Sequence, residues 1–322
     1  MPDASAKLDR PALDVIVWIA RRQLRAADAT WEQLRRAADD EALHDFRVAI
    51  RRLRSTLQAY RPHLREIVRP KDRHRLRRLA DATGPARDAE VQIARLRALR
   101  DELGADARPV VSPLLRRLRR RMRDGYAKAR AEIETLYPRT ARALERRLRR
   151  AEASPDALPF RIAIGRLIAA DTGDLRPLLE RVPPLDAPRA LHQARIETKR
   201  LRYVLEPVRL MMPGSTVLVH RLERLQDVLG DLHDFQVLEQ TIAAARPHGA
   251  SPQALRMLTR LVRGRQRRIH ADLTRSWLGP HAAAILGPLD LLTTRLGAGR
   301  RPALALRHPR QSGPVLAVVS RE

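Results

Sequence analysis

Apolar residues recur every three to four positions along most of the 322-residue chain, with polar and charged residues between them. This spacing matches the turn of an α-helix and predicts helices that each bury one face. Leucine, alanine and arginine favour helices and fill these segments, whereas prolines and glycines fall mostly between them. Only residues 314–320 have a strand-like pattern. Helices are expected over residues 11–37, 41–61, 71–83, 87–103, 110–136, 139–151, 157–181, 187–211, 215–230, 233–246, 252–275 and 277–296.

Two segments of the chain recur in the same order, which indicates an internal duplication. The segment LHDFRVAIRRLRSTL at 43–57 aligns with LHQARIETKRLRYVL at 191–205, at an offset of 148 residues. The segment HRLRRLADATGPARDAEV at 74–91 aligns with HRLERLQDVLGDLHDFQV at 220–237, at an offset of 146 residues. Ordered matches at nearly equal offsets predict two similar all-α units, with a boundary near 150–156.

Each copy of the first repeated segment places a histidine and several cations on one stripe of a helix. Successive helical residues turn by about 100°, so positions three, seven and ten residues after the histidine share its face. This stripe borders the apolar face instead of opposing it, so its side chains are expected in a groove between packed elements. The stripe consists of His44, Arg47, Arg51 and Arg54 in the first copy and His192, Arg195, Lys199 and Arg202 in the second.

Five further residues complete the candidate binding site. Arg52 and its counterpart Arg200 flank the two stripes, and Tyr203 lies near the edge of the second stripe. Arg78 and Arg224 occupy matching positions in the second repeated segment. Nearby acids offer these arginines partners within the chain, so ligand binding and ion pairing both remain open for them. The acids are Asp81, Asp88, Asp227 and Asp234.

The charge of the chain narrows the choice of partner. Lysine and arginine total 64 against 37 acidic residues, which gives a formal net charge of +27. Such an excess destabilises a compact chain through self-repulsion, so it favours a polyanionic partner: nucleic acid, an anionic membrane or polyphosphate. Only four of these cations are lysines, and the planar fork of arginine suits phosphate oxygens. A general bias in composition explains many single arginines, so only arginines at repeated, regularly spaced positions are taken as candidates for binding.

Several kinds of chemistry have no matching motif in this sequence. Cysteine is absent, which excludes disulfides and thiolate metal sites. The HExxH and P-loop patterns are missing, and the ten histidines lack metal-ligand spacing, so we predict no catalytic residue, metal or cofactor. The apolar run at 12–20 contains Asp14 and is too short to span a bilayer. Without a recognisable signal peptide, a cytoplasmic protein with no membrane partner is expected.

Three functions remain open on these observations. A non-catalytic polyphosphate-binding protein needs dense cations and few aromatic residues, which make up 3% of the chain. Nonspecific nucleic-acid binding is compatible with the charge, although proteins that bind single strands usually interleave stacking aromatics with basic residues. A metal-chelating phosphohydrolase is the weakest alternative, because the His-Asp pairs at His44 and His233 occupy non-equivalent places in the repeat.

The repeated segments resemble those of the CHAD family, the conserved histidine α-helical domain proteins. LHDFRVAIRRLRSTLQAY and LHQARIETKRLRYVLEPV are similar to its two hallmark segments, and LADATGPARDAEV and LQDVLGDLHDFQV to the segments that follow them. The resemblance covers residues 8 to 296. It departs at His233, which stands opposite Arg87 of the first copy. No triphosphate-processing CYTH domain is expected within these 322 residues.

The resemblance implies both a fold and a function. The fold is an all-α internal duplication of two four-helix bundles related by a pseudo-twofold axis, at residues 8–152 and 156–297. Residues 298–322 are then expected to be a poorly ordered tail. The function is non-catalytic binding of inorganic polyphosphate along a basic groove or pore lined by the duplicated histidine, arginine and lysine positions. The resemblance also implies that the protein associates with polyphosphate granules in the cytoplasm.

Overall fold

The fold is entirely helical across the part of the chain that the structure, a computed structural model, describes. The predicted all-α class is therefore confirmed. One isolated antiparallel bridge, between Pro11 and Pro159, is the β-type pairing found in that part. The strand-like segment at 314–320 and the predicted tail lie outside it. The structure describes residues 4–37, 39–103, 108–153, 157–245 and 252–297.

The first half of the chain builds a series of helices whose starts have local causes. The carboxylate of Asp39 accepts a hydrogen bond from the backbone N–H of Ala42 at 2.8 Å, which caps the helix that follows. Asp40 and Glu41 in the first turn favour the positive end of the same helix. The elements are α1 (Ala12–Ala37), α2 (Asp40–Ala59), α3 (Arg61–Leu64), α4 (Pro70–Ala82), α5 (Gly84–Leu103) and α6 (Arg108–Arg149).

The second half of the chain forms helices in a similar order. Proline occupies an early position in α8, where its missing N–H removes no helical hydrogen bond. The left-handed backbone at Gly214, with φ of 82°, directs the chain into α9. The elements are α7 (Phe160–Leu179), α8 (Pro188–Leu205), the 3-10 turn η3 (Glu206–Val208), α9 (Ser215–Ala245), α10 (Pro252–Trp277), the 3-10 turn η4 (Gly279–Ala282) and α11 (Ala283–Arg295).

The helix break predicted at Pro138 is wrong, because α6 runs through this residue without interruption. A proline inside a helix removes one hydrogen bond and costs about 3 kcal/mol. Ile133, Tyr137 and Leu144 are all fully or almost fully buried on both sides of Pro138. Each large apolar side chain that is buried contributes about 1.5–3 kcal/mol, so packing outweighs the loss.

The break predicted after Gly230 is also wrong, because α9 continues through it. In the sequence repeat Gly230 corresponds to Gly84, where α4 has already ended and α5 begins. Pro85 follows Gly84 and cannot donate a backbone hydrogen bond, whereas Asp231 follows Gly230 and can. The missing donor at Pro85 is one local difference between the two halves at the point where α4 ends and α9 continues.

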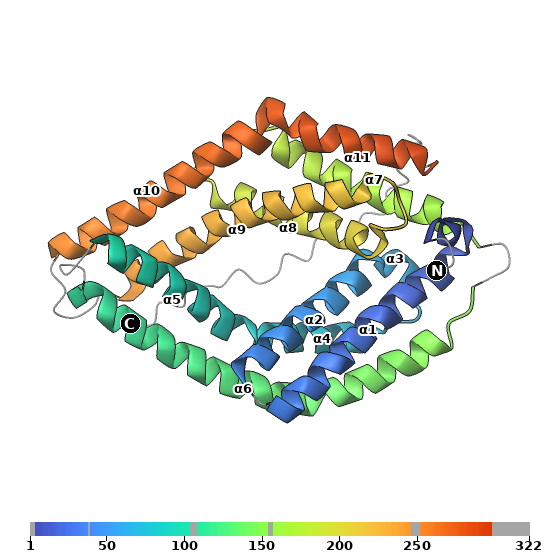
Figure 1. The fold of residues 1–322 in the computed structure, drawn as a ribbon, viewed down its shortest axis with the longest axis horizontal. Coiled ribbons are helices and arrows are strands. Elements are labelled where there is room, and N and C mark those ends of the chain that lie inside the picture. The colour runs from blue at the N-terminus through green and yellow to red at the C-terminus, as the bar shows by residue number, and fades with distance from the viewer. Residues whose placement is uncertain (1–3, 38, 104–107, 154–156, 246–251, 298–322) are drawn as a thin grey trace.

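The helices form an elongated arrangement with α2 and α8 near its middle (Figure 1). Helix α6 runs along one long edge, α10 and α11 lie along the opposite edge, and α2 packs against α8 between them (Figure 1). Tyr60, at the end of α2, is fully buried and donates a hydrogen bond from its hydroxyl to the carbonyl of Val204 in α8 at 2.9 Å. This contact holds the ends of the two central helices together.

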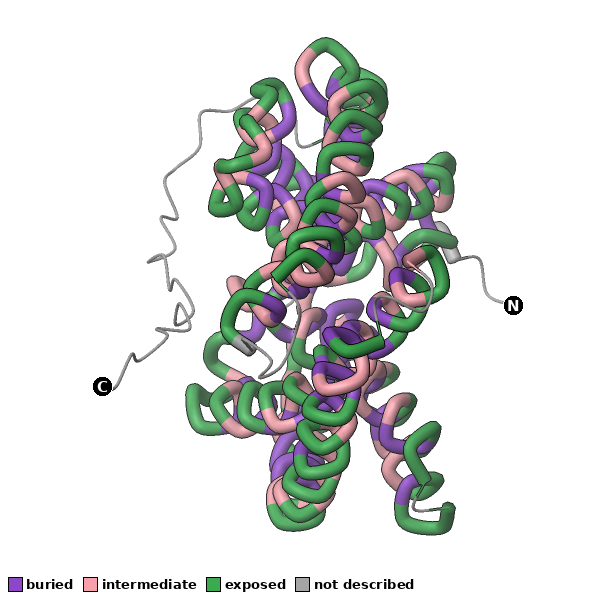
Figure 2. The backbone as a smooth tube through the Cα atoms, turned by 90° about the vertical axis from the view of Figure 1, so that its left-hand side faces the viewer, coloured by how far each residue is buried: buried purple, intermediate pink, exposed green. Residues whose placement is uncertain are grey.

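The hydrophobic core links both halves of the chain. One cluster of buried residues extends from Ala12 to Leu296, and a second joins α5 and α6 to α9 and α10. Figure 2 shows the buried positions where helices meet and the exposed positions on their outer sides. Since the first cluster contains residues of both α2 and α8, the pairing of these two helices rests on a shared core.

Gly125 allows α6 to approach α5 closely. A Cβ added at Gly125 would lie 3.1 Å from the backbone nitrogen of Ala86 and 3.2 Å from its Cα. Gly125→Leu is therefore expected to lower the free energy of unfolding by about 1–3 kcal/mol, as overpacking does. Gly264→Ala in α10 is the control, since a Cβ there would meet nothing within 4 Å, and it should stabilise by about 0.5–1 kcal/mol. Urea denaturation measures both, and unchanged stability in Gly125→Leu would contradict the close contact.

Candidate functional site

The packing of α2 against α8 brings the two predicted stripes together around Lys199. Arg51 and Arg54 of α2 and Arg195 and Arg202 of α8 all act on the Lys199 ammonium. Burial lowers the pKa of Lys199 first, and these four guanidinium groups lower it further, to about 7. A lysine surrounded in this way loses much of its charge near neutral pH, and a bound anion would restore it.

We use the name basic cluster for Arg47, Arg51, Arg54, Arg195 and Lys199. Within the described ranges, none of these five side chains forms an ion pair with a carboxylate. The Nε atoms of Arg51 and Arg195 are buried and have no hydrogen-bond partner in that part of the chain. Buried donors normally have partners, so these two unsatisfied donors mark a site that lacks acceptors.

Carboxylates border one side of the basic cluster without pairing closely with it. Burial lowers the pKa of Arg47. The charges of Arg51 and Arg87 lower this pKa further, whereas Asp88 acts in the opposite direction. Burial raises the pKa of Asp88 even though Arg47 and other arginines oppose this shift. The corresponding acid in the second half, Asp234, lies 3.2 Å from Arg95. Asp88 therefore tempers the charge of Arg47, and Asp234 connects α9 to α5.

Several of the other predicted arginines have carboxylate partners within the chain. Arg202 lies 3.2 Å from Glu223 and 3.5 Å from Glu206, and it is buried. It also stacks over the ring of Tyr203 at 4.7 Å. Arg224 is exposed. The remaining pairs are Arg52 with Glu206 at 3.6 Å, Arg78 with Glu132 at 2.8 Å and Arg200 with Asp171 at 3.0 Å.

The partners of Arg200 form an acidic group on α7 and α8. Asp174 and Glu197 also lie within 3.6 Å and 3.5 Å of Arg200. Burial raises the pKa of Asp171 to about 7, and Arg200 opposes this shift. Arg200 is thus committed to neutralising buried carboxylates, and its charge belongs to the scaffold behind the second stripe.

The histidine of the second stripe contacts a second histidine. The rings of His192 and His233 are 5.2 Å apart. Burial and the charge of Arg195 lower the pKa of His192, and burial followed by Arg195 and His192 lowers that of His233 to about 4. Both imidazoles are therefore neutral near neutral pH in the free protein. His44 is half-buried at the start of the stripe on α2.

Four residues near the cluster were absent from the predicted set. Arg77 acts on Arg54, Arg87 acts on Arg47, and Arg121 acts on Asp88. The fourth is His233, described above. Arg77 follows His74 by three residues, the same spacing that begins both stripes, and this spacing would have indicated it. Arg121 comes from α6, and only the folded chain brings it near Asp88 of α5.

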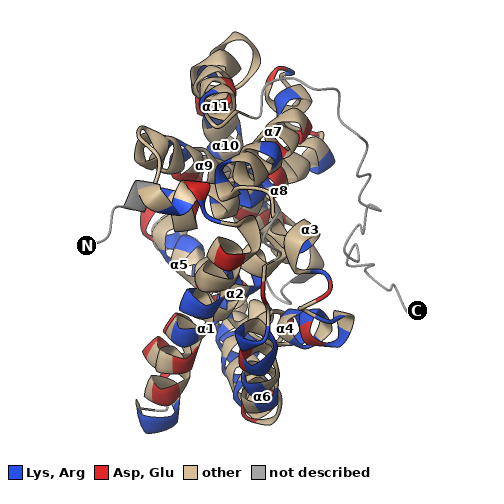
Figure 3. Cartoon of the chain, turned by 90° about the vertical axis from the view of Figure 1, so that its right-hand side faces the viewer, with Lys and Arg blue, Asp and Glu red and all other residues tan. Residues whose placement is uncertain are grey.

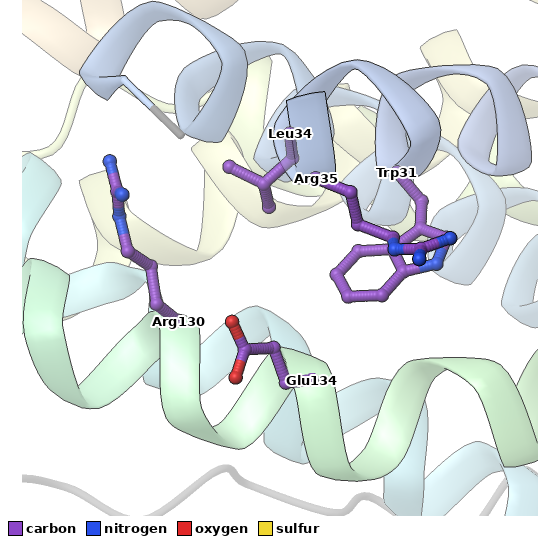
Figure 4. A pocket seen from close by; sticks show the side chains of 5 residues that line it. All are labelled: Trp31, Leu34, Arg35, Arg130 and Glu134. Atoms are coloured by element: carbon purple, nitrogen blue, oxygen red, sulfur yellow. The ribbon is translucent and has the colours of Figure 1, made fainter. Parts of the chain in front are cut away.

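No group of three or more histidine, aspartate or glutamate side chains that could hold a metal ion occurs among the described residues. A cavity of about 250 Å³ lies between α1 and α6, where Trp31, Leu34 and Arg35 face Arg130 and Glu134 (Figure 4). None of these five residues belongs to the basic cluster. In the described part of the chain, no helix is both long and apolar enough to cross a membrane.

The fold and the cluster define an all-helical protein with concentrated positive charge where two central helices meet, and no carboxylate of the described residues forms an ion pair with that cluster. The chain belongs to the CHAD domain family, whose model matches residues 19–243. The resemblance seen in the repeated segments is therefore confirmed.

Two solved structures are similar to the chain in fold. PptA from Streptomyces chartreusis is 17% identical with a TM-score of 0.67, and the match covers 83% of this chain and 99% of PptA. The CHAD domain from the plant Ricinus communis is 21% identical with a TM-score of 0.59, and the match covers 91% of this chain and 94% of that domain. No curated protein matches the chain.

Proposed function

We propose that this protein binds inorganic polyphosphate without catalysis, along the basic cluster of α2 and α8. The observation that carries the proposal is the gathering of five basic side chains from two helices with no carboxylate paired to any of them in the described ranges. Such an arrangement repels itself, and a polyanion supplies the missing negative charge. Polyphosphate has a negative charge on each phosphate unit and no base that requires an aromatic platform.

The residues of the site divide into two roles in this proposal. The guanidinium forks of the basic cluster and the Lys199 ammonium donate charge-assisted hydrogen bonds to phosphate oxygens. His44 and His192 add imidazole hydrogen-bond donors at the ends of the stripes. Tyr203 contributes its ring beside Lys199, at 5.9 Å. Three arginines with carboxylate partners brace the helices that present the cluster, namely Arg52, Arg200 and Arg202. Arg78 ties α4 to α6 through Glu132, and Arg224 remains an exposed cation.

We also propose the duplication into bundles at 8–152 and 156–297, related by a pseudo-twofold axis. Two contacts support it. Pro11 pairs with Pro159, and Arg51 is a near neighbour of Lys199. Both pairs are 148 residues apart, which is the offset of the first sequence repeat. Counterparts touch each other only near a symmetry axis.

A pseudo-twofold site favours polyphosphate over a single strand of nucleic acid. Linear polyphosphate has no chain direction, so it presents the same atoms to both halves of such a site. A nucleic-acid strand runs in one direction and would meet the two stripes differently. The proposed symmetry and the scarcity of aromatic residues therefore point to the same ligand.

A salt titration of binding to long-chain polyphosphate tests this proposal. The logarithm of the association constant should fall linearly with the logarithm of salt concentration, because each phosphate contact releases a counterion. A pull-down on long polyphosphate and on duplex DNA at physiological salt gives the comparison, with polyphosphate expected to be retained more strongly. Retention of duplex DNA without retention of polyphosphate would overturn the proposal.

A further inference from the structure

Two outer helices carry a second set of repeated arginines. Residues 114–124, LLRRLRRRMRD, align with residues 258–268, LTRLVRGRQRR, at an offset of 144 residues. In each segment three arginines follow the spacing i, i+3 and i+7, which places them on one helical face. We name them the outer arginine rows: Arg116, Arg119 and Arg123 on α6, and Arg260, Arg263 and Arg267 on α10.

The outer arginine rows lie on the solvent side of their helices. Five of the six arginines are exposed, and Arg119 is partly exposed. The core side of the same turns is occupied by buried residues such as Leu118 and Val262. The two helices form opposite outer edges of the molecule in Figure 1, and Figure 3 shows the concentration of basic residues along α6. A long ligand can therefore reach these rows without entering the centre of the molecule.

Acidic residues are scarce in and around these segments, although the same helices carry them elsewhere. Residues 252–271 of α10 contain no acid, and residues 108–131 of α6 contain only Asp124. Exposed helices usually place acids three or four residues from bases, because such pairs stabilise the helix and like charges destabilise it. A high arginine content alone does not remove the acids.

One ion pair partly neutralises the outer arginine rows. Arg263 lies 2.6 Å from Glu239 of α9. No carboxylate within the described ranges forms an ion pair with any of the other five arginines. The rows therefore keep a net positive charge at matching positions in both halves, which indicates a partner instead of simple solvation.

We propose that the outer arginine rows bind the phosphate backbone of duplex nucleic acid, independently of the basic cluster. A duplex is a rigid rod with phosphates on its outside, and it can lie against an exposed helix where regularly spaced guanidinium groups meet its backbone. Each row extends for about 10 Å along its helix, at 1.5 Å per residue. Contacts to phosphates carry no sequence information, so this binding is nonspecific. A flexible polyphosphate chain fits the half-buried cluster better, because it can bend into the space between helices.

The test uses the full chain, a short mixed-sequence DNA duplex and long polyphosphate, with affinities measured by fluorescence anisotropy over a range of salt concentrations. The outer variant combines Arg116→Gln, Arg123→Gln, Arg260→Gln and Arg267→Gln. The control variant combines Arg51→Gln with Lys199→Gln in the basic cluster. Circular dichroism checks that both variants keep their helical content and melting temperature.

The outer variant should bind the duplex about tenfold or more weakly than the wild type. The slope of the logarithm of its duplex affinity against the logarithm of salt concentration should become shallower by about one for each charge removed. Its polyphosphate affinity should change little, and the control variant should show the reverse pattern. Unchanged duplex affinity in the outer variant, or equal losses for both ligands, would overturn the inference. If the outer variant loses duplex binding while the wild type fails to bind polyphosphate, this inference stands and the proposed function falls.

Discussion

Replacing Arg47, Arg51, Arg195 and Lys199 together by alanine is expected to lower the affinity for polyphosphate by about a hundredfold or more at physiological salt. Each hydrogen bond to a charged group contributes about 1.5–3 kcal/mol. In the proposed complex, these four side chains together donate several such bonds to phosphate oxygens. Their partly desolvated position strengthens each contact relative to one on an exposed surface. Isothermal titration calorimetry or anisotropy with long polyphosphate measures the change.

A matched control removes the same number of charges elsewhere. Alanine at Arg116, Arg117, Arg119 and Arg120 of α6 lowers the formal net charge by the same amount without touching α2 or α8. This control should weaken polyphosphate binding only slightly, through the smaller overall field of the protein. If the two quadruple variants lose affinity equally, total charge and not the basic cluster determines the binding.

The positions of most helices follow from the sequence, but their continuity does not. Apolar periodicity locates the buried faces, and Asp39 and Pro70 mark helix starts by their own chemistry. Pro138 and Gly230 are strong breaking signals, yet helices pass through both. The burial of Tyr137 against Phe46, whose ring centroids are 4.9 Å apart, is a long-range contact that no local pattern contains.

The candidate site divides in the same way between local and long-range information. The repeated spacing of histidine and cations identifies the stripes, because a helix converts that spacing into one face. The spacing does not show which cations find carboxylates. Arg200 meets Asp171 from α7, and Arg202 meets Glu223 from α9. The lowered pKa of Lys199 likewise depends on arginines from α2, which lie about 150 residues away in the chain.

Polyphosphate affinity is expected to rise as pH falls from about 9 to 7, by up to about tenfold per pH unit, because binding takes up a proton at Lys199. The pKa of Lys199 is about 7 in the free protein, so above that pH its amine is mostly neutral. Bound phosphates favour the charged form and raise this pKa, so the bound state holds more protons than the free state throughout that range. Below the free pKa of about 7 both states are protonated, and the affinity should level off.

Two substitutions separate Lys199 from His192 as the origin of this pH dependence. Lys199→Arg keeps the charge at all these pH values, so it should flatten the profile and bind more tightly than the wild type near pH 9. His192→Gln should leave the profile above pH 7 unchanged, because burial and Arg195 lower the pKa of His192 below its ordinary value and so place its titration outside that range. A wild-type profile with no slope between about pH 7 and 9, or a slope that persists in Lys199→Arg, would show that Lys199 does not gain a proton on binding.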